Sequence, residues 1–175
     1  SLVASLISNN GVSKTEKWAH RFVGNFARKP EGNDRAQIMA VANGEADIAI
    51  ANSYYIGLML SGKKGDEQRA AARKVNLHFP SQAGRGAHIN VSGVGLMKNS
   101  PNKANAVKFI EFLLSDKAQE HIVNNTYEYP LSANVAPSDL IAQFGTGFKE
   151  DQTSVADYGK FNPDAVKLMD RVGWQ

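Results

Sequence analysis

Two adjacent tyrosines, Tyr54 and Tyr55, are the residues of this sequence whose type and spacing first suggest chemistry. The apolar residues 47–51 before them predict a short strand, and Asn52 and Ser53, both favoured helix N-caps, predict that a helix begins there. Neighbouring side chains diverge along a strand or a helix, so the two phenols share a target only if the backbone turns between these elements. Such a corner lies at the carboxyl end of a strand, where open α/β sheets usually bind ligands.

The chemistry favoured by two adjacent phenols is the binding of a hard, highly charged cation. A tyrosine ionises near pH 10, so two neighbouring phenolates require a strong cation to hold their charge. Ferric iron fits this requirement because it prefers charged oxygen donors, and tyrosinate ligates iron in some haem enzymes. Ordinary aromatic packing is the alternative that the spacing alone leaves open.

Sites that use other metal ligands have less support in the sequence. The chain has no cysteine, which excludes disulfides, thiolate zinc sites, iron–sulfur clusters and a cysteine nucleophile. Zinc or copper sites usually recruit histidines, and the four histidines show no spacing typical of a metal motif. These histidines are His20, His78, His88 and His121.

The composition is that of a globular chain with no pronounced charge. Its 175 residues suffice for one ordinary domain or two small lobes, and 42% are hydrophobic and 21% charged. The net charge of +3 is spread along the chain, which argues against nucleic acid as a partner. No apolar run approaches the roughly 20 residues that span a bilayer, and the opening SLVASLI lacks the basic stretch of a signal peptide.

The first half of the chain predicts helices around the tyrosine pair. Ser13 stands three residues before Glu16, a capping-box spacing that predicts an amphipathic helix ending before Pro30. Asp34 is expected to cap the next helix, which Gly44 ends. Because this helix leads into the predicted strand, the expected fold class is α/β with parallel strands.

The second half predicts three further helices. Two lie within residues 101–125, where Pro101 opens the first and Asp116 caps the second. For the last helix, Asn162 is the expected cap and Gly173 the end. Its first helical residue is then Pro163, and its inward-facing residues are expected to be Val166, Met169 and Val172.

The stretch YEYPLSANVAPSDL between these helices contains two prolines among polar residues and is expected to be a loop or a crossover. It holds a second pair of tyrosines, Tyr127 and Tyr129, which alternate as strand or loop residues do. We expect both to pack beside Pro130.

The sequence resembles a known family, the periplasmic ferric-ion-binding proteins of bacterial ABC iron transporters. The resemblance rests on GNDRAQIMAVANGEADIAIANSYYIG, on NVSGVGLMKNSPNKANAVKFIEFLLSDKAQEHI, on YEYPL and on FNPDAVKLMDRVGW, and it runs through the whole chain. It implies that Tyr54 and Tyr55 are ferric ligands. It also implies a role for Asn52 in binding a synergistic anion such as carbonate or phosphate, which only some members need. Asp34 and Arg35, with Asn33, would lie in a second cleft-facing loop of such proteins, although capping of the following helix is the preferred interpretation.

The resemblance implies a periplasmic binding protein-like fold of type II, an α/β fold with two lobes joined by crossover strands. Residues 1–84 and 136–175 would form the C-terminal lobe, and residues 85–135 would belong to the N-terminal lobe. The N-terminal portion of such proteins, including a further tyrosine ligand expected just ahead of Ser1, is missing from the sequence. Either that portion or another chain is expected to complete the fold.

The expected function is that of a solute receptor, not an enzyme, which holds Fe³⁺ in an interlobe cleft and delivers it to an ABC permease. Its expected location is the periplasm, or a membrane-tethered position outside the cytoplasm. One alternative keeps the fold but changes the ligand to an anion or a small organic solute. Another is an enzyme that uses the cleft, for which the sequence offers neither a nucleophile motif nor a carboxylate pair of suitable spacing.

Overall fold

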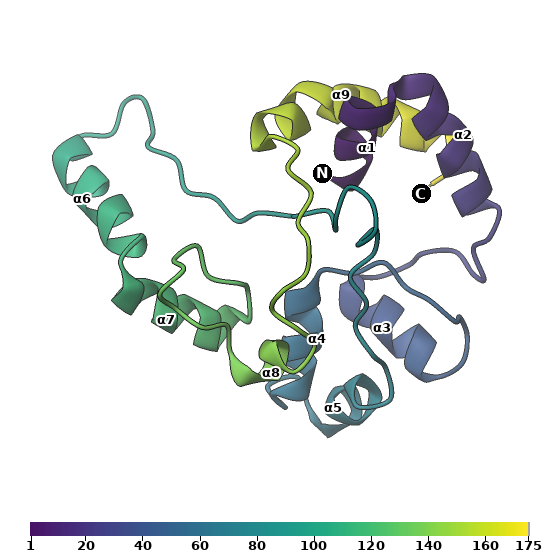
Figure 1. Ribbon diagram of the computed structural model, residues 1–175, viewed down its shortest axis with the longest axis horizontal. Helices are drawn as coiled ribbons and strands as arrows, with labels where there is room; N and C mark the ends of the chain where they lie inside the picture. Colours follow the sequence, from purple (N-terminus) through teal and green to yellow (C-terminus); the bar gives the residue numbers. More distant parts are fainter. Residues whose placement is uncertain (175) are drawn as a thin grey trace.

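The computed structural model describes residues 1–174, and its regular structure is almost entirely helical (Figure 1). None of the helices in this part of the chain combines the length and the apolar character needed to cross a membrane. The helices are α1 (Leu2–Asn10), α2 (Val12–Val23), α3 (Asp34–Ala42), α4 (Ser53–Leu60), α5 (Asp66–Ala72), α6 (Lys103–Leu113), α7 (Asp116–Thr126), α8 (Asp139–Ala142) and α9 (Val155–Val172).

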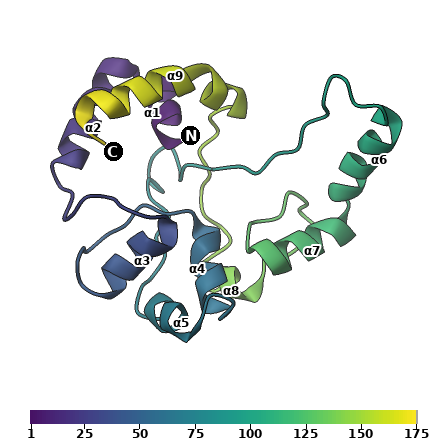
Figure 2. The same cartoon turned by 180° about the vertical axis from the view of Figure 1, so that it is seen from behind.

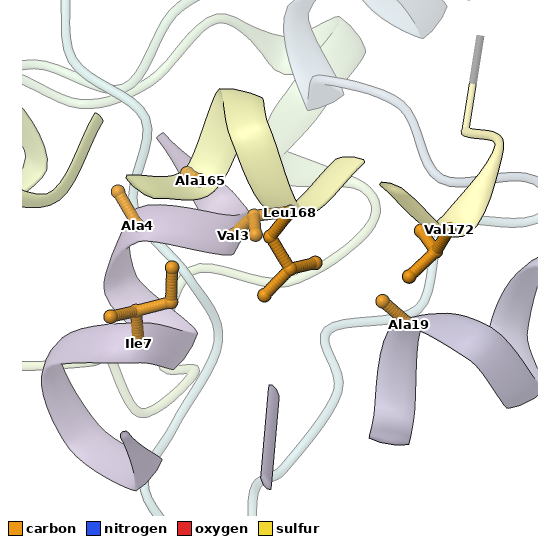
Figure 3. Close-up of a cluster of buried hydrophobic side chains, with 7 residues drawn as sticks. All are labelled: Val3, Ala4, Ile7, Ala19, Ala165, Leu168 and Val172. Atoms are coloured by element: carbon orange, nitrogen blue, oxygen red, sulfur yellow. The ribbon is translucent and has the colours of Figure 1, made fainter. Parts of the chain in front are cut away.

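The two ends of the chain meet in one helical unit, because α9 packs against both α1 and α2. Leu168 of α9 is fully buried between the apolar side chains of α1 and the small residue Ala19 of α2 (Figure 3). Trp174 adds an aromatic cluster by packing against Trp18 and Phe22, with ring centroids 6.0 and 5.0 Å away. This unit therefore depends on packing between α9 and the buried residues of α1 and α2, which lie more than 140 positions earlier in the chain.

Helix α9 is longer than the sequence predicts. It begins at Val155, where the hydroxyl of Ser154 accepts a hydrogen bond from the backbone of Ala156, so Pro163 lies inside the helix and Asn162 is not its cap. The predicted end at Gly173 is confirmed by its left-handed backbone, with φ of 73°. Since the helix packs along α1 over several turns, its tertiary contacts outweigh the stop that a proline usually imposes.

The predicted inward face of α9 is correct only in part. Val172 is buried and Met169 packs against the cluster of α1, but Val166 is exposed. Besides Val172, the buried residues of α9 are Tyr158, Ala165 and Leu168. The small side chain of Ala165 lets α9 approach α1 closely, which a count of large apolar residues did not reveal.

A second helical unit carries the tyrosine pair and consists of α3, α4, α5 and α8 (Figure 1). Its core is built around Met59, Ile56 and Ile141. Helix α3 ends as predicted near Gly44, whose φ is 78°. The N–H groups of Gly44 and Glu45 return to carbonyl groups of α3 at 3.0 and 2.9 Å, which is the hydrogen-bond pattern of a Schellman motif.

Three predicted helix caps are wrong by one or two residues. The observed N-caps are Gly11 for α2, Asn33 for α3 and Ser115 for α7, whereas the capping boxes predicted Ser13, Asp34 and Asp116. The side chain of Asn33 accepts hydrogen bonds from the backbone of two following residues, at 3.1 and 3.3 Å. For α3 and α7 two cap-forming residues are adjacent, and either one satisfies the local pattern, so the spacing does not decide between them.

The predicted α/β class is not confirmed, because residues 47–51 have no regular secondary structure and the described residues 1–174 contain no strand. Ile48 and Ile50 of this segment are 85% and 51% exposed. A strand requires a partner for its N–H and C=O groups. In the described residues the one β-type pairing is an isolated parallel bridge between Ala87 and Glu150.

This bridge joins the two extended segments that connect the helical units. The backbone of Ala87 donates to Lys149 and accepts from Asp151, both at 2.8 Å. Gly86 permits the contact, because a Cβ at this position would lie 2.6 Å from the backbone of Glu150. The buried carboxylate of Asp151 then accepts from Ser5 of α1 at 2.8 Å and pairs with Arg85 at 3.1 Å. These contacts attach the two bridged segments to the unit formed by α1, α2 and α9.

Helices α6 and α7 project to one side of the molecule, beyond α8 (Figures 1 and 2). Within the described residues, α6 buries none of its side chains, and it packs against α7. The end of α7 is anchored by Tyr127, which is buried against α4 where Gly57 leaves room for it. This contact links the α6–α7 pair to the helix that carries the tyrosine pair.

We predict that Gly57→Ala destabilises the protein. A methyl group at this position would lie 2.7 Å from the Cβ of Tyr127 and 2.9 Å from the Cδ1 of Ile141, so the packing must shift at a cost of about 1–3 kcal/mol. Denaturant unfolding should show this loss. Gly159→Ala is the matched control, because Gly159 lies in α9 with open space around it and should gain about 0.5–1 kcal/mol. Equal stabilities of the two variants would contradict the packing argument.

Candidate metal site

The start of α4 is held by a carboxylate from the start of α3. One oxygen of Asp34, Oδ1, accepts hydrogen bonds from the backbone N–H of Asn52 at 2.7 Å and from its side-chain Nδ2 at 3.0 Å. Asn52 has the extended backbone of an N-cap, as predicted, with φ of −73° and ψ of 136°. Its side chain is engaged with Asp34 and does not close on the described N–H groups of its own helix. The corner before the tyrosines is therefore fixed by α3.

Tyr54 and Tyr55 occupy the first turn of α4, with their ring centroids 4.3 Å apart and their planes inclined by 34°. Both side chains are partly buried and pack against the core of the second helical unit. The backbone turn at Asn52 thus brings the two rings side by side at the edge of this core. The rings are close enough for their phenols to act on one small ligand.

The surroundings of the pair favour the neutral form of Tyr54. Burial is the main cause that raises the pKa of the Tyr54 phenol well above its ordinary value, followed by the neighbouring Tyr55 phenol. The negative charges of Asp34 and Glu128 raise this pKa further. A carboxylate on each of two separate segments therefore contributes a negative potential at the tyrosine.

Glu128 was not among the residues selected from the sequence. It follows the end of α7, and its carboxylate accepts hydrogen bonds from Ser92 and, at 3.1 Å, from Thr126. The only signal in the sequence was an acidic residue within YEYPL. Its proximity to Tyr54 arises because Tyr127 docks on Gly57, a contact between segments 70 positions apart that spacing does not reveal.

A chain of polar side chains continues from Asn52 toward the first helical unit. Asn90 donates to Asn52 at 3.0 Å and its own Oδ1 accepts from Ser1 at 3.0 Å. The Ser1 hydroxyl also lies 3.0 Å from Nε2 of His88. Burial lowers the pKa of His88, which favours a neutral ring. The structure thus connects this histidine to the site through Ser1, Asn90 and Asn52.

Arg35 is placed apart from the tyrosines. Its guanidinium donates to Gln68 of α5 at 3.1 Å. Both residues line a cavity of about 350 Å³ that also contains Arg28 and Glu45, and neither tyrosine lines this cavity. Of the predicted second-loop residues, the structure therefore brings Asp34 to the corner of α4, uses Asn33 as a helix cap and directs Arg35 elsewhere.

Both tyrosines of the second pair pack in the core of the second helical unit. Tyr127 is buried in the left-handed conformation that ends α7, with φ of 65°. Burial acts to raise the pKa of its phenol, but hydrogen bonds to Lys63 and Ser61 and the Lys63 charge hold that pKa below its ordinary value. Tyr129 donates to the carbonyl of Gly145 at 3.0 Å, and burial raises its pKa to about 12.

The donor atoms at the corner of α4 are oxygens. Within residues 1–174 there is no cluster of three or more histidines, cysteines or acidic residues that could hold a metal ion. Two phenols with two nearby carboxylates instead suit a hard cation that can displace phenol protons. The remaining coordination positions would then be supplied by water, by the cation's own chelator or by other protein groups.

Comparison with known proteins gives a consistent family assignment. A family model described as bacterial extracellular solute-binding protein matches residues 8–120. The chain is 50% identical over 175 residues to iron uptake protein A1 of Synechocystis. This alignment covers all of this chain and 48% of that protein. It is 36% identical over 107 residues to the major ferric iron-binding protein of Neisseria meningitidis, which covers 61% of this chain and 31% of that one.

Solved structures agree with these matches. The Trichodesmium protein FutA (IdiA), solved in complex with iron and citrate ligands, superposes with a TM-score of 0.95 at 52% identity, over 99% of this chain and 54% of that one. The ferric binding protein of Campylobacter jejuni superposes with a TM-score of 0.93 at 39% identity, again over 99% and 54%. The chain thus spans about half the length of the curated relatives and the solved structures that it matches.

We predict that Tyr54 ionises at a higher pH than an ordinary tyrosine. In the unfolded chain its phenol ionises near pH 10, but in the folded protein its pKa is raised. The resulting stability is fully present below pH 10 and is lost as the pH rises toward the folded-state pKa. Phenolate absorbance should therefore give a difference titration between the unchanged protein and Tyr54→Phe with a midpoint above 10.

Tyr127→Phe provides a control of opposite sign for this titration. Because Lys63 and Ser61 hold the pKa of Tyr127 below its ordinary value, its difference titration should have a midpoint below 10. A midpoint at or below 10 for Tyr54 would show that the described burial and negative charges do not act on it.

Proposed function

This chain belongs to the family of bacterial extracellular solute-binding proteins, and we propose that it binds ferric ion through Tyr54 and Tyr55. The observation that carries the proposal is the pair of adjacent phenols with the carboxylates of Asp34 and Glu128 beside Tyr54. In this role the protein makes and breaks no covalent bond in its cargo. It holds the ion as a receptor.

The charges around the pair support a cation over the alternative ligands. A phosphate-like anion at this position would face two carboxylates and receive no counter-charge from Arg35, whose guanidinium lies at Gln68. A neutral organic solute would gain nothing from the negative potential. A trivalent cation is attracted by both carboxylates and accepts phenolate oxygen as a ligand.

The cation must displace protons to bind. Tyr54 is a neutral phenol at neutral pH, as an unperturbed tyrosine is, and burial and negative charge raise its pKa further. A ferric ion within bonding distance reverses this preference, since a bound cation favours the ionised form of its ligand. Negative charge that opposes ionisation in the empty site therefore becomes favourable once the ion is present.

The names of the relatives support the same cargo. The curated relatives are named as iron uptake and ferric iron-binding proteins, and one solved neighbour contains iron. We place this chain accordingly outside the cytoplasm, in the periplasm or tethered to a membrane, with an ABC permease as the partner that receives the ion. Residues 1–84 and 136–175 would form one lobe of the receptor and residues 85–135 part of the other. The iron would lie between them.

We predict that the chain develops a visible absorbance band when titrated with ferric citrate. Tyrosinate bound to ferric iron produces a charge-transfer band, whereas a hydrogen-bonding tyrosine does not. The Tyr54→Phe and Tyr55→Phe single variants should weaken the band, and the double variant should lose it.

Tyr129→Phe is the matched control for this titration. Its phenol is bonded to Gly145 within an aromatic cluster, so its loss should leave the band unchanged. A band that survives in the double variant would exclude the tyrosine pair as ligands. If neither this chain nor the chain joined to the remaining half that its relatives possess develops colour, the ferric proposal is wrong.

We also predict that acid weakens ferric-ion binding. Each phenol that becomes a ligand releases one proton, so the apparent affinity should fall about tenfold per pH unit for each proton released. Because the pKa of Tyr54 is raised, this dependence should continue across the whole range below pH 10. Titrations between about pH 8 and 6 at constant chelator excess, corrected for the chelator's own protonation, measure it. An affinity independent of pH would mean that no phenol is deprotonated on binding.

A further inference from the structure

The positive net charge of the chain is concentrated in one segment, which corrects the expectation of an even spread. Residues 61–75 hold five cations and two acidic residues, an excess equal to the net charge of +3 of the whole chain. The remaining residues therefore hold cations and acidic residues in equal number. The five cations are all exposed, and we call them the basic surface: Lys63, Lys64, Arg69, Arg73 and Lys74.

Helix α5 directs part of the basic surface toward solvent. Its residues Ala71 and Ala72 are buried in the core of the second helical unit, so the opposite face of the helix points outward. Arg69 and Arg73 stand four positions apart, which places them one above the other on the exposed side of the helix. The two guanidinium groups therefore extend from the same side of α5.

The loop before α5 extends this surface. The Cδ of Arg69 lies 3.5 Å from the position that a Cβ would take at Gly62, so the arginine packs beside the loop that carries Lys63 and Lys64. The amino group of Lys63 lies 5.0 Å from the centroid of the Tyr127 ring, a cation–π contact that fixes the edge of the surface.

The charges of the basic surface are available to an external partner. Among residues 1–174 the ion pairs are formed by Arg28, Arg85 and Arg171, none of which belongs to the basic surface. Helix α5 lies at the end of the second helical unit that is remote from α1, α2 and α9 (Figures 1 and 2). The cations thus gather at one end of the molecule.

An anionic lipid surface is the partner that this composition fits best. Protein interfaces usually bury apolar or aromatic anchors, and residues 61–75 expose no large apolar side chain. Single-stranded nucleic acid stacks on aromatic side chains, and this segment contains none. Lysine and arginine are attracted to anionic headgroups without either feature, because the attraction is electrostatic.

We propose that the basic surface docks the protein on an anionic phospholipid membrane, with α5 toward the headgroups. Because α5 packs against α3 and α4, the unit that carries the tyrosine pair is then the one that faces the membrane. The inference goes beyond the function proposed above and does not depend on the binding of iron.

The test is co-sedimentation of the iron-free chain with lipid vesicles. One set contains phosphatidylcholine alone, and the other contains equal parts of phosphatidylcholine and phosphatidylglycerol. The chain should sediment with the anionic vesicles in about 50 mM NaCl and be released in about 0.5 M NaCl, where charges are screened beyond a few ångströms. Exposed apolar side chains elsewhere, such as Ile48, would instead give binding to phosphatidylcholine that salt does not remove.

Two double variants of equal charge separate the basic surface from net charge. Lys64→Gln with Lys74→Gln should weaken binding to the anionic vesicles about tenfold or more, since each cation near such a membrane contributes about fivefold. Lys14→Gln with Lys17→Gln removes the same charge from exposed positions of α2 and should leave the affinity nearly unchanged. Circular dichroism verifies that both variants are folded.

The inference is overturned if both double variants lose affinity equally, or if binding persists on phosphatidylcholine and in high salt. It is also overturned if the anionic vesicles do not bind the chain while a polyglutamate resin retains it through Lys64 and Lys74, because the surface then fits an acidic protein. The same holds if the chain joined to the remaining half that its relatives possess does not bind the vesicles. None of these measurements contains iron, so the proposed ferric function is tested separately.

Discussion

The pairing of Asp34 with Asn52 is the interaction on which the arrangement of the site depends. One carboxylate oxygen accepts from both the backbone and the side chain of Asn52, which fixes where α4 begins relative to α3. Because Tyr54 and Tyr55 lie in the first turn of α4, any rotation at this corner would separate their rings from the core. A hydrogen bond to a charged acceptor is stronger than one between neutral groups, which helps to fix the position of the tyrosine pair.

The same corner combines features that oppose one another in the empty protein. Tyr54 is partly buried, adjacent to a second phenol and exposed to two negative charges, and all of these disfavour its ionised form. When a multivalent cation is bound, the second phenol and the two negative charges favour binding, whereas burial still disfavours the phenolate. Under the proposed ferric function these features favour the occupied state, and binding must release the proton that Tyr54 carries in the empty state. An arrangement that destabilises phenolate in the empty protein is therefore compatible with the proposed phenolate ligation of a cation.

Tertiary contacts account for the parts of the fold that sequence patterns did not predict. Helix α9 continues through Pro163 because it packs along α1, and residues 47–51 form no strand because a strand needs a neighbour. Two of the predicted caps were misplaced by one residue where two polar residues stood together, at Asn33 and Asp34 and at Ser115 and Asp116. By contrast, Gly44 and Gly173 ended their helices as predicted, since their left-handed backbone is a local requirement that few other residues meet.

For the site, the sequence alone determined the adjacent tyrosines, the N-cap position of Asn52 and the absence of cysteine, which together favour oxygen ligation of a hard cation. Only the tertiary structure decided which side chains surround the pair. It brought Asp34 and Glu128 to Tyr54, directed Arg35 to Gln68 and buried Tyr127 against Gly57. The physical reason is range: capping and turn preferences act over a few residues, whereas burial and charge act between segments that meet only when the chain has folded.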